Sequence, residues 1–307
     1  YYFLITCYRG IKADLTIVRL AADTFRVICG GDTGHRDLVW IQRMATARGA
    51  VITLENQTHR LATLGVWGPK ARETLSQLMT SPDALSPQNF HFATAQTFEI
   101  AGITVWAFRI SYVGEQGFEL YFDFDSGLPL WDQLFALGVV PIGVETYANS
   151  RRLEKSLRLQ NADLETDFNL YEAGLARSVV KKAAFHGKPA YLAQREIDQQ
   201  DSYLCTLVML ANEDAKGVKR YPVGEWPILD ADTGLVLIDA CGRRSFSTSI
   251  SYGPSLGQNL LLSYIPAARA KVGETFVLEY FCEHYPIRVE ALGSVPVLDP
   301  DNERSRS

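Results

Sequence analysis

The most constraining feature of the sequence is the regular succession of short strand-like runs in its last third. From Ser202 onward, each run is closed by Gly, Pro or Asp. The runs are "CTLVML", "WPILDADTGLVLIDACG", "SFSTSISYG" and "TFVLEYFCEHYPIRVEAL". Short strands at nearly even spacing are typical of an antiparallel barrel. We therefore predict a C-terminal β-barrel domain over residues 200–307.

The preceding residues mix helical and strand patterns. Helical spacing covers His35–Arg48, Leu128–Leu137 and Gly143–Leu159, and Pro69 suits the first turn of a further helix. Alternation predicts a hairpin of Ile11–Leu20 and Asp23–Gly31, followed by strands at His59–Gly68, Ala95–Gly102 and Ile103–Ile110. Residues 1–199 are therefore predicted to form an α+β domain, which ends near Gln199.

Charge and residue usage exclude several classes of function. Lys and Arg number 30 against 35 Asp and Glu, a net charge of −5 that provides no basic surface for nucleic acid. No apolar run approaches the ~18 residues of a membrane span. The five histidines have no metal-ligand spacing, so we expect no metal site. The five scattered cysteines never form CxxC, which indicates reduced thiols and a cytoplasmic or mitochondrial matrix location.

The stretch "ISYVGEQGFELYF" places a carboxylate, Glu119, between Phe118 and Leu120. Glu is depleted in strands, and a carboxylate desolvated without partners costs several kcal/mol. Strand alternation puts Glu119 on the face opposite to its apolar neighbours. The residues alone thus allow two interpretations, a side chain in water or a side chain that binds a ligand, and favour the first.

Three further residues have ordinary explanations when taken singly. Asp14 suits the solvent face of a strand after a glycine turn, and Tyr112 is an aromatic residue before the Gly-rich turn at Gly114 and Gly117. Arg152 lies in "SRRLEKSLR", which reads as a solvated helix face with i,i+4 charge pairs.

Taken jointly, several segments resemble one family. They are "GIKADLTIVRL", "GVWGPKARETL", "SYVGEQGFELYF", "RRLEKSLRLQNADLETDFNLYEAGLA" and "PVLDPDNERSR". Their order is similar to that of the aminomethyltransferase (glycine-cleavage T-protein) family. "HRDLVWI" and "NLYEAGLA" favour the folate-binding C-terminal half of the dimethylglycine and sarcosine dehydrogenases. The resemblance implies an α+β folate-binding T-protein-like domain followed by a small C-terminal β-barrel, with folate in a central channel.

The resemblance also implies roles for the four residues. Glu119 corresponds to the glutamate that accepts the pterin N–H groups through both carboxylate oxygens, and Tyr112, seven residues earlier, lines the same pocket. Asp14 corresponds to the aspartate beside the reactive nitrogens of tetrahydrofolate, where it assists proton removal. Arg152 matches the arginine of the "LRLE" helix and is expected to support the cofactor-binding pocket.

The sequence departs from the family pattern in three places. An arginine upstream of Arg152 is replaced by Ala148, and the T-protein's asparagine falls near Gly30. Both changes weaken a pure T-protein assignment and leave the dehydrogenase-like branch open. The strands and helix that precede the Asp14 segment in relatives have no counterpart in "YYFLITCYRG", so we expect an N-terminally incomplete folate domain, either a fragment of a longer enzyme or a divergent form.

The resemblance implies a tetrahydrofolate-dependent one-carbon transferase. The iminium carbon of an oxidised N-methyl amine, such as dimethylglycine or sarcosine, would be captured as 5,10-methylene-tetrahydrofolate. FAD would reside only on a separate or missing domain, supplied by a flavoprotein dehydrogenase. The alternative is a non-catalytic folate-binding or regulatory relative that acts through protein contacts, although it would need neither Asp14 nor Glu119. The iron–sulfur assembly branch is set aside, because "SVVKKAAFHGKPAY" lacks its cysteine.

Overall fold

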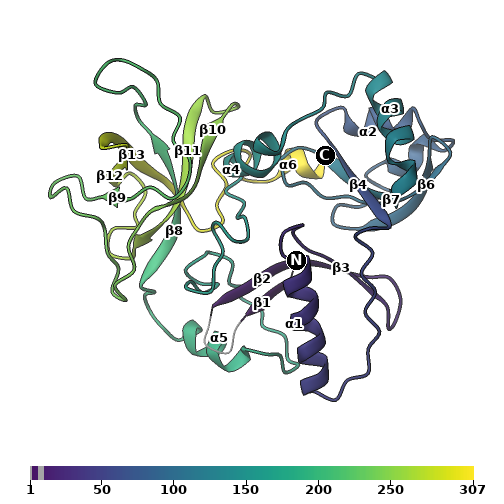
Figure 1. Cartoon of the computed structure of the whole chain (residues 1–307), viewed down its shortest axis with the longest axis horizontal. Coiled ribbons are helices and arrows are strands. Elements are labelled where there is room, and N and C mark those ends of the chain that lie inside the picture. The colour runs from purple at the N-terminus through teal and green to yellow at the C-terminus, as the bar shows by residue number, and fades with distance from the viewer. Residues whose placement is uncertain (1, 6–9) are drawn as a thin grey trace. The chain divides into compact units, whose positions relative to one another are not determined.

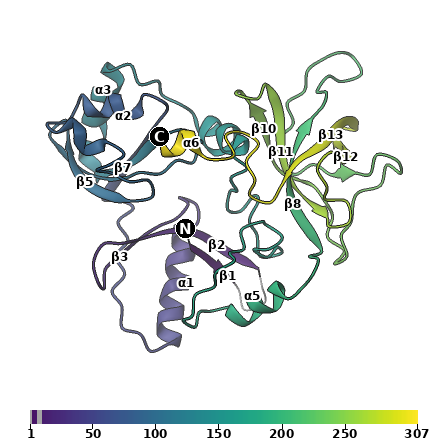
Figure 2. The same ribbon diagram turned by 180° about the vertical axis from the view of Figure 1, so that it is seen from behind.

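A computed structural model describes residues 2–5 and 10–307 of the chain, so Cys7 lies outside the described residues. The chain forms two compact units. The first comprises residues 1–30 and 144–300, and the second comprises residues 31–143 and 301–307. Figures 1 and 2 show the elements of these units from opposite sides.

The second unit is built on a four-stranded antiparallel sheet with the strand order β4-β7-β6-β5. Its strands are β4 (Leu61–Trp67), β5 (Ala95–Ile100), β6 (Ile103–Phe108) and β7 (Gly117–Asp123). Its helices are α1 (Gly34–Ala47), α2 (Ala71–Ser76), α3 (Gly127–Ala136) and α6 (Glu303–Arg306), with 3₁₀ turns η1 (Pro82–Leu85) and η2 (Phe124–Ser126).

Alternation along β7 decides which face of this sheet forms the core. The buried side chains of the strand are Phe118, Leu120 and Phe122. They pack with Leu75 of α2 and Leu130 of α3 in one apolar cluster. Both views show these two helices beside the sheet. Because successive side chains point to opposite faces, Glu119 lies on the other face, as the alternation predicted.

The first unit contains a small antiparallel sheet with the order β1-β2-β3. Its strands are β1 (Tyr2–Ile5), β2 (Ile11–Arg19) and β3 (Phe25–Ile28). The pairing of β2 with β3, in which Arg19 lies opposite Phe25, confirms the predicted hairpin. The start of β2 is also tied to the rest of the unit, because the Ile11 amide donates to the Phe168 carbonyl at 3.1 Å.

The same unit holds a six-stranded antiparallel sheet with the order β10-β11-β8-β13-β12-β9. The strands are β8 (Ser202–Met209), β9 (Ile228–Leu229), β10 (Ser247–Gly253), β11 (Gln258–Pro266), β12 (Thr275–Tyr280) and β13 (Glu283–Leu292). A bridge between Pro227 and Phe246 links the segments that precede β9 and β10, the two edge strands. The α+β class with a C-terminal barrel is thus confirmed.

Two helical regions differ from the sequence expectation. In place of one helix over Gly143–Leu159, a π-helix η3 (Glu145–Arg151) leads into a short α4 (Arg152–Glu154). The helix ends because Ser156 adopts a left-handed backbone with φ of +52°. A further helix, α5 (Lys188–Arg195), begins after Gly187 in a segment for which the sequence predicted no element.

Candidate functional site

Glu119 lies in the middle of β7, on the face of the sheet that is not the apolar core. In the paired strands it stands opposite Gly65 of β4 and Phe108 of β6. Residues directly opposite one another in an antiparallel sheet share a face. The side chain is half-buried, and its Oε2 accepts a hydrogen bond from the Tyr121 hydroxyl at 2.6 Å. Within the described part of the chain this is its one hydrogen bond through the carboxylate.

Aromatic rings lie on the same face of the sheet as this carboxylate. Trp106 and Phe108 of β6 share the face with Glu119 and Tyr121, and the rings of Trp106 and Tyr121 meet edge to face with centroids 5.2 Å apart. Phe108 is only 5% exposed. Glu119 therefore lies in a partly desolvated setting, on a face of the sheet that also carries aromatic rings.

Glycine at position 65 lets a further ring lie across the strand. A Cβ atom added to Gly65 would lie 1.8 Å from Cη2 of Trp67, and one added to Gly117 would lie 2.2 Å from Cδ1 of the same ring. The indole is held there by its Nε1, which donates to the Ile110 carbonyl at 3.2 Å. The segment "GVWG" thus builds an indole wall two residues along β4 from the position opposite Glu119.

Burial raises the pKa of the Glu119 carboxyl, and the Tyr121 hydroxyl opposes this shift by donating to the carboxylate. Tyr112 lies in the loop between β6 and β7 and is half-buried. Gly114, in the same loop, has a φ of +76° that suits glycine. Glu119 and Tyr112 both belong to the second unit, which comprises residues 31–143 and 301–307.

Asp14 lies in β2 of the first unit, where it pairs with Phe3 of β1. The side chain is half-buried between the buried residues Ala13 and Leu15. Its Oδ1 is buried and has no hydrogen-bond partner among the described residues. Burial raises the pKa of this carboxyl to about 6. An unpaired buried oxygen on a carboxylate is costly, which makes Asp14 a candidate for contact with a polar ligand.

Arg152, at the start of α4, is fully buried in the first unit. Its Nη1 donates to Asp163 at 2.5 Å and to the Leu157 carbonyl at 2.9 Å. Its Nη2 donates to the Ser249 hydroxyl of β10 at 2.5 Å, and its Nε donates to the Ala148 carbonyl at 2.8 Å. All three nitrogens therefore bond to protein groups, a geometry suited to holding α4 against the barrel.

The four predicted residues thus divide between the two units. Asp14 and Arg152 belong to the first, and Tyr112 and Glu119 to the second. The sequence reasoning missed Trp67, although its indole and the glycine beside it shape the face around Glu119. The signal was available in "GVWG", where glycine at a strand position facing an aromatic residue indicates close packing of a ring on the backbone.

Comparison with a solved structure identifies the fold of this chain. The structure of an aminomethyltransferase T of the glycine cleavage system from Bartonella henselae superposes with a TM-score of 0.76 at 23% identity, over 97% of this chain and 75% of that one. The chain thus has the fold of the T-type aminomethyltransferases. The GCVT N-terminal domain family matches residues 1–183, and the chain belongs to this family.

The sequence is also similar to two curated relatives with different names. The aminomethyltransferase of Desulfitobacterium hafniense is 30% identical, over 87% of this chain and 68% of the relative. The mitochondrial dimethylglycine dehydrogenase of Homo sapiens is 33% identical, over 90% of this chain. The chain spans only 30% of the length of that dehydrogenase. No helix within residues 2–5 and 10–307 is both long and apolar enough to cross a membrane.

Proposed function

We propose that this chain transfers a one-carbon unit to tetrahydrofolate, and that Glu119 binds the pterin ring. The observation that carries the proposal is the half-buried carboxylate of Glu119, which has a single hydroxyl donor, Tyr121. The 2-amino-4-oxo edge of a pterin presents paired N–H donors, and a carboxylate is the side chain that accepts two in parallel. Acceptor capacity on Glu119 remains for such a ligand.

The neighbours of Glu119 fit a flat ring. The Trp67 indole and the rings of β6 provide planar apolar surfaces, and Gly65 lets the indole lie directly against the strand backbone. Heteroaromatic rings pack favourably in offset or edge-to-face arrangements on such surfaces. Tyr112, from the loop that leads into β7, would contribute a further wall.

Asp14 is proposed as the catalytic carboxylate. When bound, tetrahydrofolate supplies the amine nitrogens that take up the carbon. Asp14 would orient an N–H group through its unpaired Oδ1 and accept the proton released there. A carboxyl with a pKa of about 6 changes protonation state near neutral pH, which suits a general base. Arg152 would act at a distance, because its guanidinium is occupied in holding α4 to β10.

The substrate is proposed to be a small N-methyl amine such as dimethylglycine or sarcosine. The similarity to dimethylglycine dehydrogenases supports this choice over a carrier-bound aminomethyl group. A flavoprotein dehydrogenase, as a separate subunit or domain, would oxidise the amine with FAD, and the product would be 5,10-methylene-tetrahydrofolate. Because the named dehydrogenase is mitochondrial, the mitochondrial matrix is the first compartment to examine and the cytoplasm the second.

Transfer of a ¹³C label from the N-methyl group to tetrahydrofolate tests this proposal. The purified chain is mixed with tetrahydrofolate, a formaldehyde scavenger and dimethylglycine that carries ¹³C in its N-methyl groups and is oxidised in situ by a flavoprotein. We expect the wild-type chain to place the label in 5,10-methylene-tetrahydrofolate and Asp14→Asn to leave it with the scavenger. Asp123→Asn, which alters an exposed carboxylate at the end of β7, serves as the control. Equal label transfer by the wild-type chain and Asp14→Asn would refute the assigned role.

A further inference from the structure

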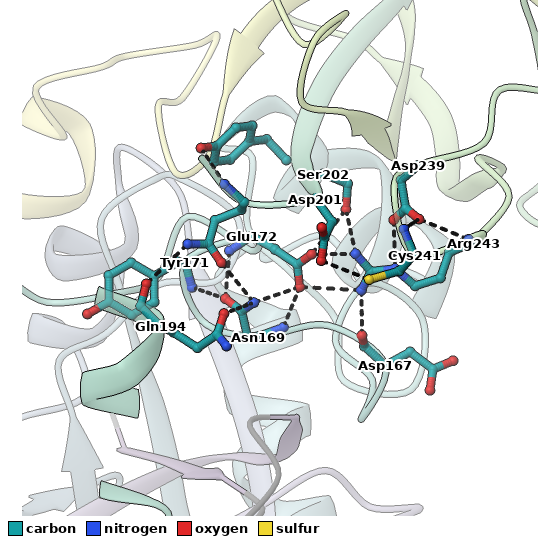
Figure 3. A network of polar contacts seen from close by, with 12 residues as sticks. Asp167, Asn169, Tyr171, Glu172, Gln194, Asp201, Ser202, Asp239, Cys241 and Arg243 are labelled. Carbon is teal, nitrogen blue, oxygen red and sulfur yellow. Dashed lines mark hydrogen bonds and ion pairs between the residues drawn. The ribbon is translucent and has the colours of Figure 1, made fainter. Parts of the chain in front are cut away.

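Arg243 extends from the segment between β9 and β10 to a loop of the same unit, residues 165–173 (Figure 3). Its Nη1 donates to the Asp167 carbonyl at 2.6 Å. Its Nη2 forms an ion pair with Glu172, and its Nε bonds to Asp239 at 2.7 Å. The Glu172 and Asp239 side chains are 2% and 3% exposed, so these charges are held in a dry setting. Charge-assisted bonds of this kind fix the geometry of both partners.

The guanidinium also covers an aromatic ring of the loop. The Arg243 Cζ lies 4.5 Å from the centroid of the Phe168 ring, and that ring stacks on Tyr264 of β11 with an interplanar angle of 3°. Arg243 thereby touches the loop at its backbone, at a ring and at a carboxylate. Together with Tyr264 it encloses Phe168, which is only 7% exposed.

This loop holds the strand that carries Asp14. The Phe168 carbonyl accepts the bond from the Ile11 amide, the first residue of β2. One residue earlier, a Cβ atom on Gly10 would lie only 2.0 Å from the Thr166 carbonyl oxygen, so the two backbones are in close contact. Because a strand is a stiff, extended segment, a displacement at Ile11 is transmitted to Asp14 three residues further on.

We propose that Arg243 is a positioning residue for Asp14, acting through Phe168 and the start of β2. The inference rests on the catalytic role proposed for Asp14, but the mechanical link can be tested without any activity. Nothing in the sequence analysis singled out Arg243, because its partners are separated from it by as many as 76 residues.

Arg269 provides a matched control within the same barrel. It bonds to two carboxylates, Asp230 at 2.6 Å and Glu274 at 2.7 Å, and its Cζ lies 5.1 Å from the centroid of Phe276. It thus has the same kinds of partner as Arg243, but none of them belongs to the loop at residues 165–173. A purely structural contribution of Arg243 would be reproduced at Arg269.

The first measurement is hydrogen exchange of the Ile11 amide in Arg243→Met, Arg243→Lys and Arg269→Met. We expect Arg243→Met to exchange this amide on the order of 10-fold faster than the wild-type chain, after correction for global stability. The exchange rate of the Ile11 amide in Arg243→Lys should lie between those of the wild-type chain and Arg243→Met. An ammonium keeps the charge but cannot make the forked bonds or stack as a guanidinium does. Arg269→Met should match the wild-type chain.

The second measurement is steady-state transfer to tetrahydrofolate with the same variants. We expect Arg243→Met to lower kcat on the order of 10-fold with little change in KM for folate, because misplacement affects the reacting group more than binding. Unchanged exchange at Ile11 in Arg243→Met would overturn the link, as would an equal change in Arg269→Met. If the wild-type chain shows no turnover, the proposed function is contradicted. The exchange rate of the Ile11 amide then decides by itself whether Arg243 positions the start of β2.

Discussion

At the scale of single residues, two carboxylates stand out for the same physical reason. Burial raises the pKa of both Asp14 and Glu119, so each charge costs stability where it stands. Glu119 recovers part of that cost through the Tyr121 hydroxyl, whereas the buried Oδ1 of Asp14 has no partner within the described residues. Desolvated, incompletely satisfied carboxylates are typical of sites that bind a polar ligand.

The raised pKa of Asp14 predicts how stability changes with pH. Between the ordinary value of 3.8 and about 6, the folded chain keeps a proton that the unfolded chain has lost, so stability falls as pH rises through this window. Asp14→Asn removes the effect. We expect the variant to be more stable than wild type by about 3 kcal/mol at about pH 7.5 and nearly equal to it at about pH 4.

Urea unfolding at the two pH values measures this difference. Asp123→Asn is the control, since it makes the same exchange of carboxylate for amide at an exposed position. A stability difference between Asp14→Asn and wild type that is the same at both pH values would show that the Asp14 carboxyl titrates normally in the folded chain.

Arg152 is predicted to affect stability far more than any surface ion pair. Its side chain is 0% exposed and bonds to Asp163, whose side chain is equally buried. We expect Arg152→Met to lower the free energy of unfolding by about 3–5 kcal/mol, because it removes the cationic partner of the buried Asp163 side chain. Arg288→Met, which breaks a partly exposed pair with Glu290, should cost no more than about 1 kcal/mol.

A double variant sharpens the interpretation of Arg152. If the cost comes from the stranded carboxylate, Arg152→Met combined with Asp163→Leu should be more stable than Arg152→Met alone. Costs that simply add would show that the two side chains act independently, contrary to the ion pair described above.

At the scale of elements, β4 is built around a glycine. Gly65→Ala would place a methyl group where the Trp67 ring lies, so the indole must move and lose its bond to the Ile110 carbonyl. We expect a loss of about 1–3 kcal/mol in the free energy of unfolding, typical of overpacking, and a red shift of tryptophan emission. Gly127→Ala, where the nearest atoms lie 3.8 Å away, should be neutral in both measurements. Unaltered emission in Gly65→Ala would contradict this packing.

Most elements could be predicted from local patterns, and the exceptions have identifiable causes. Helical spacing over His35–Arg48 corresponds to α1, and alternation located β7 and the face that Glu119 occupies. The run "TFVLEYFCEHYPIRVEAL" contains a hairpin turn at Phe281 and Cys282, whose φ values of +50° and +62° are usually adopted by Asn and Gly. A turn made of such residues has no local signal, so β12 and β13 read as one segment.

At the scale of the whole molecule, the candidate site was less predictable than the fold. The roles proposed for Asp14, Tyr112 and Glu119 rest on a family resemblance, because spacing along the chain alone favoured solvent-facing carboxylates. The network of Arg152 could not be predicted, since Asp163 and Ser249 reach it only through the fold. The same holds for Arg243, whose bond to the Asp167 carbonyl joins residues 76 apart.

The division of the chain is likewise a property of the whole molecule. The sequence suggested domains over residues 1–199 and 200–307, whereas the compact units interleave the chain, with residues 301–307 in the unit of residues 31–143. In that unit, buried Arg109 donates to the backbone oxygens of Arg306 and Ser307 at 2.7 Å. A long-range link of this kind leaves no pattern in either segment. We propose that the boundary expected near residue 199 marks the start of the β-barrel.

The central claim is that Glu119 binds the pterin of tetrahydrofolate. The most direct measurement is calorimetric titration of the purified chain with tetrahydrofolate under anaerobic conditions, for wild type, Glu119→Gln and Glu99→Gln. Glu99 is the matched control. It also lies on a strand of the four-stranded sheet, β5, and its carboxylate accepts a hydrogen bond from the Thr104 hydroxyl at 2.6 Å. We predict that wild type and Glu99→Gln bind equally, and that Glu119→Gln binds more weakly by about 2 kcal/mol, roughly 30-fold. Equal affinity of all three variants, or no binding by the folded wild-type chain, would contradict the claim.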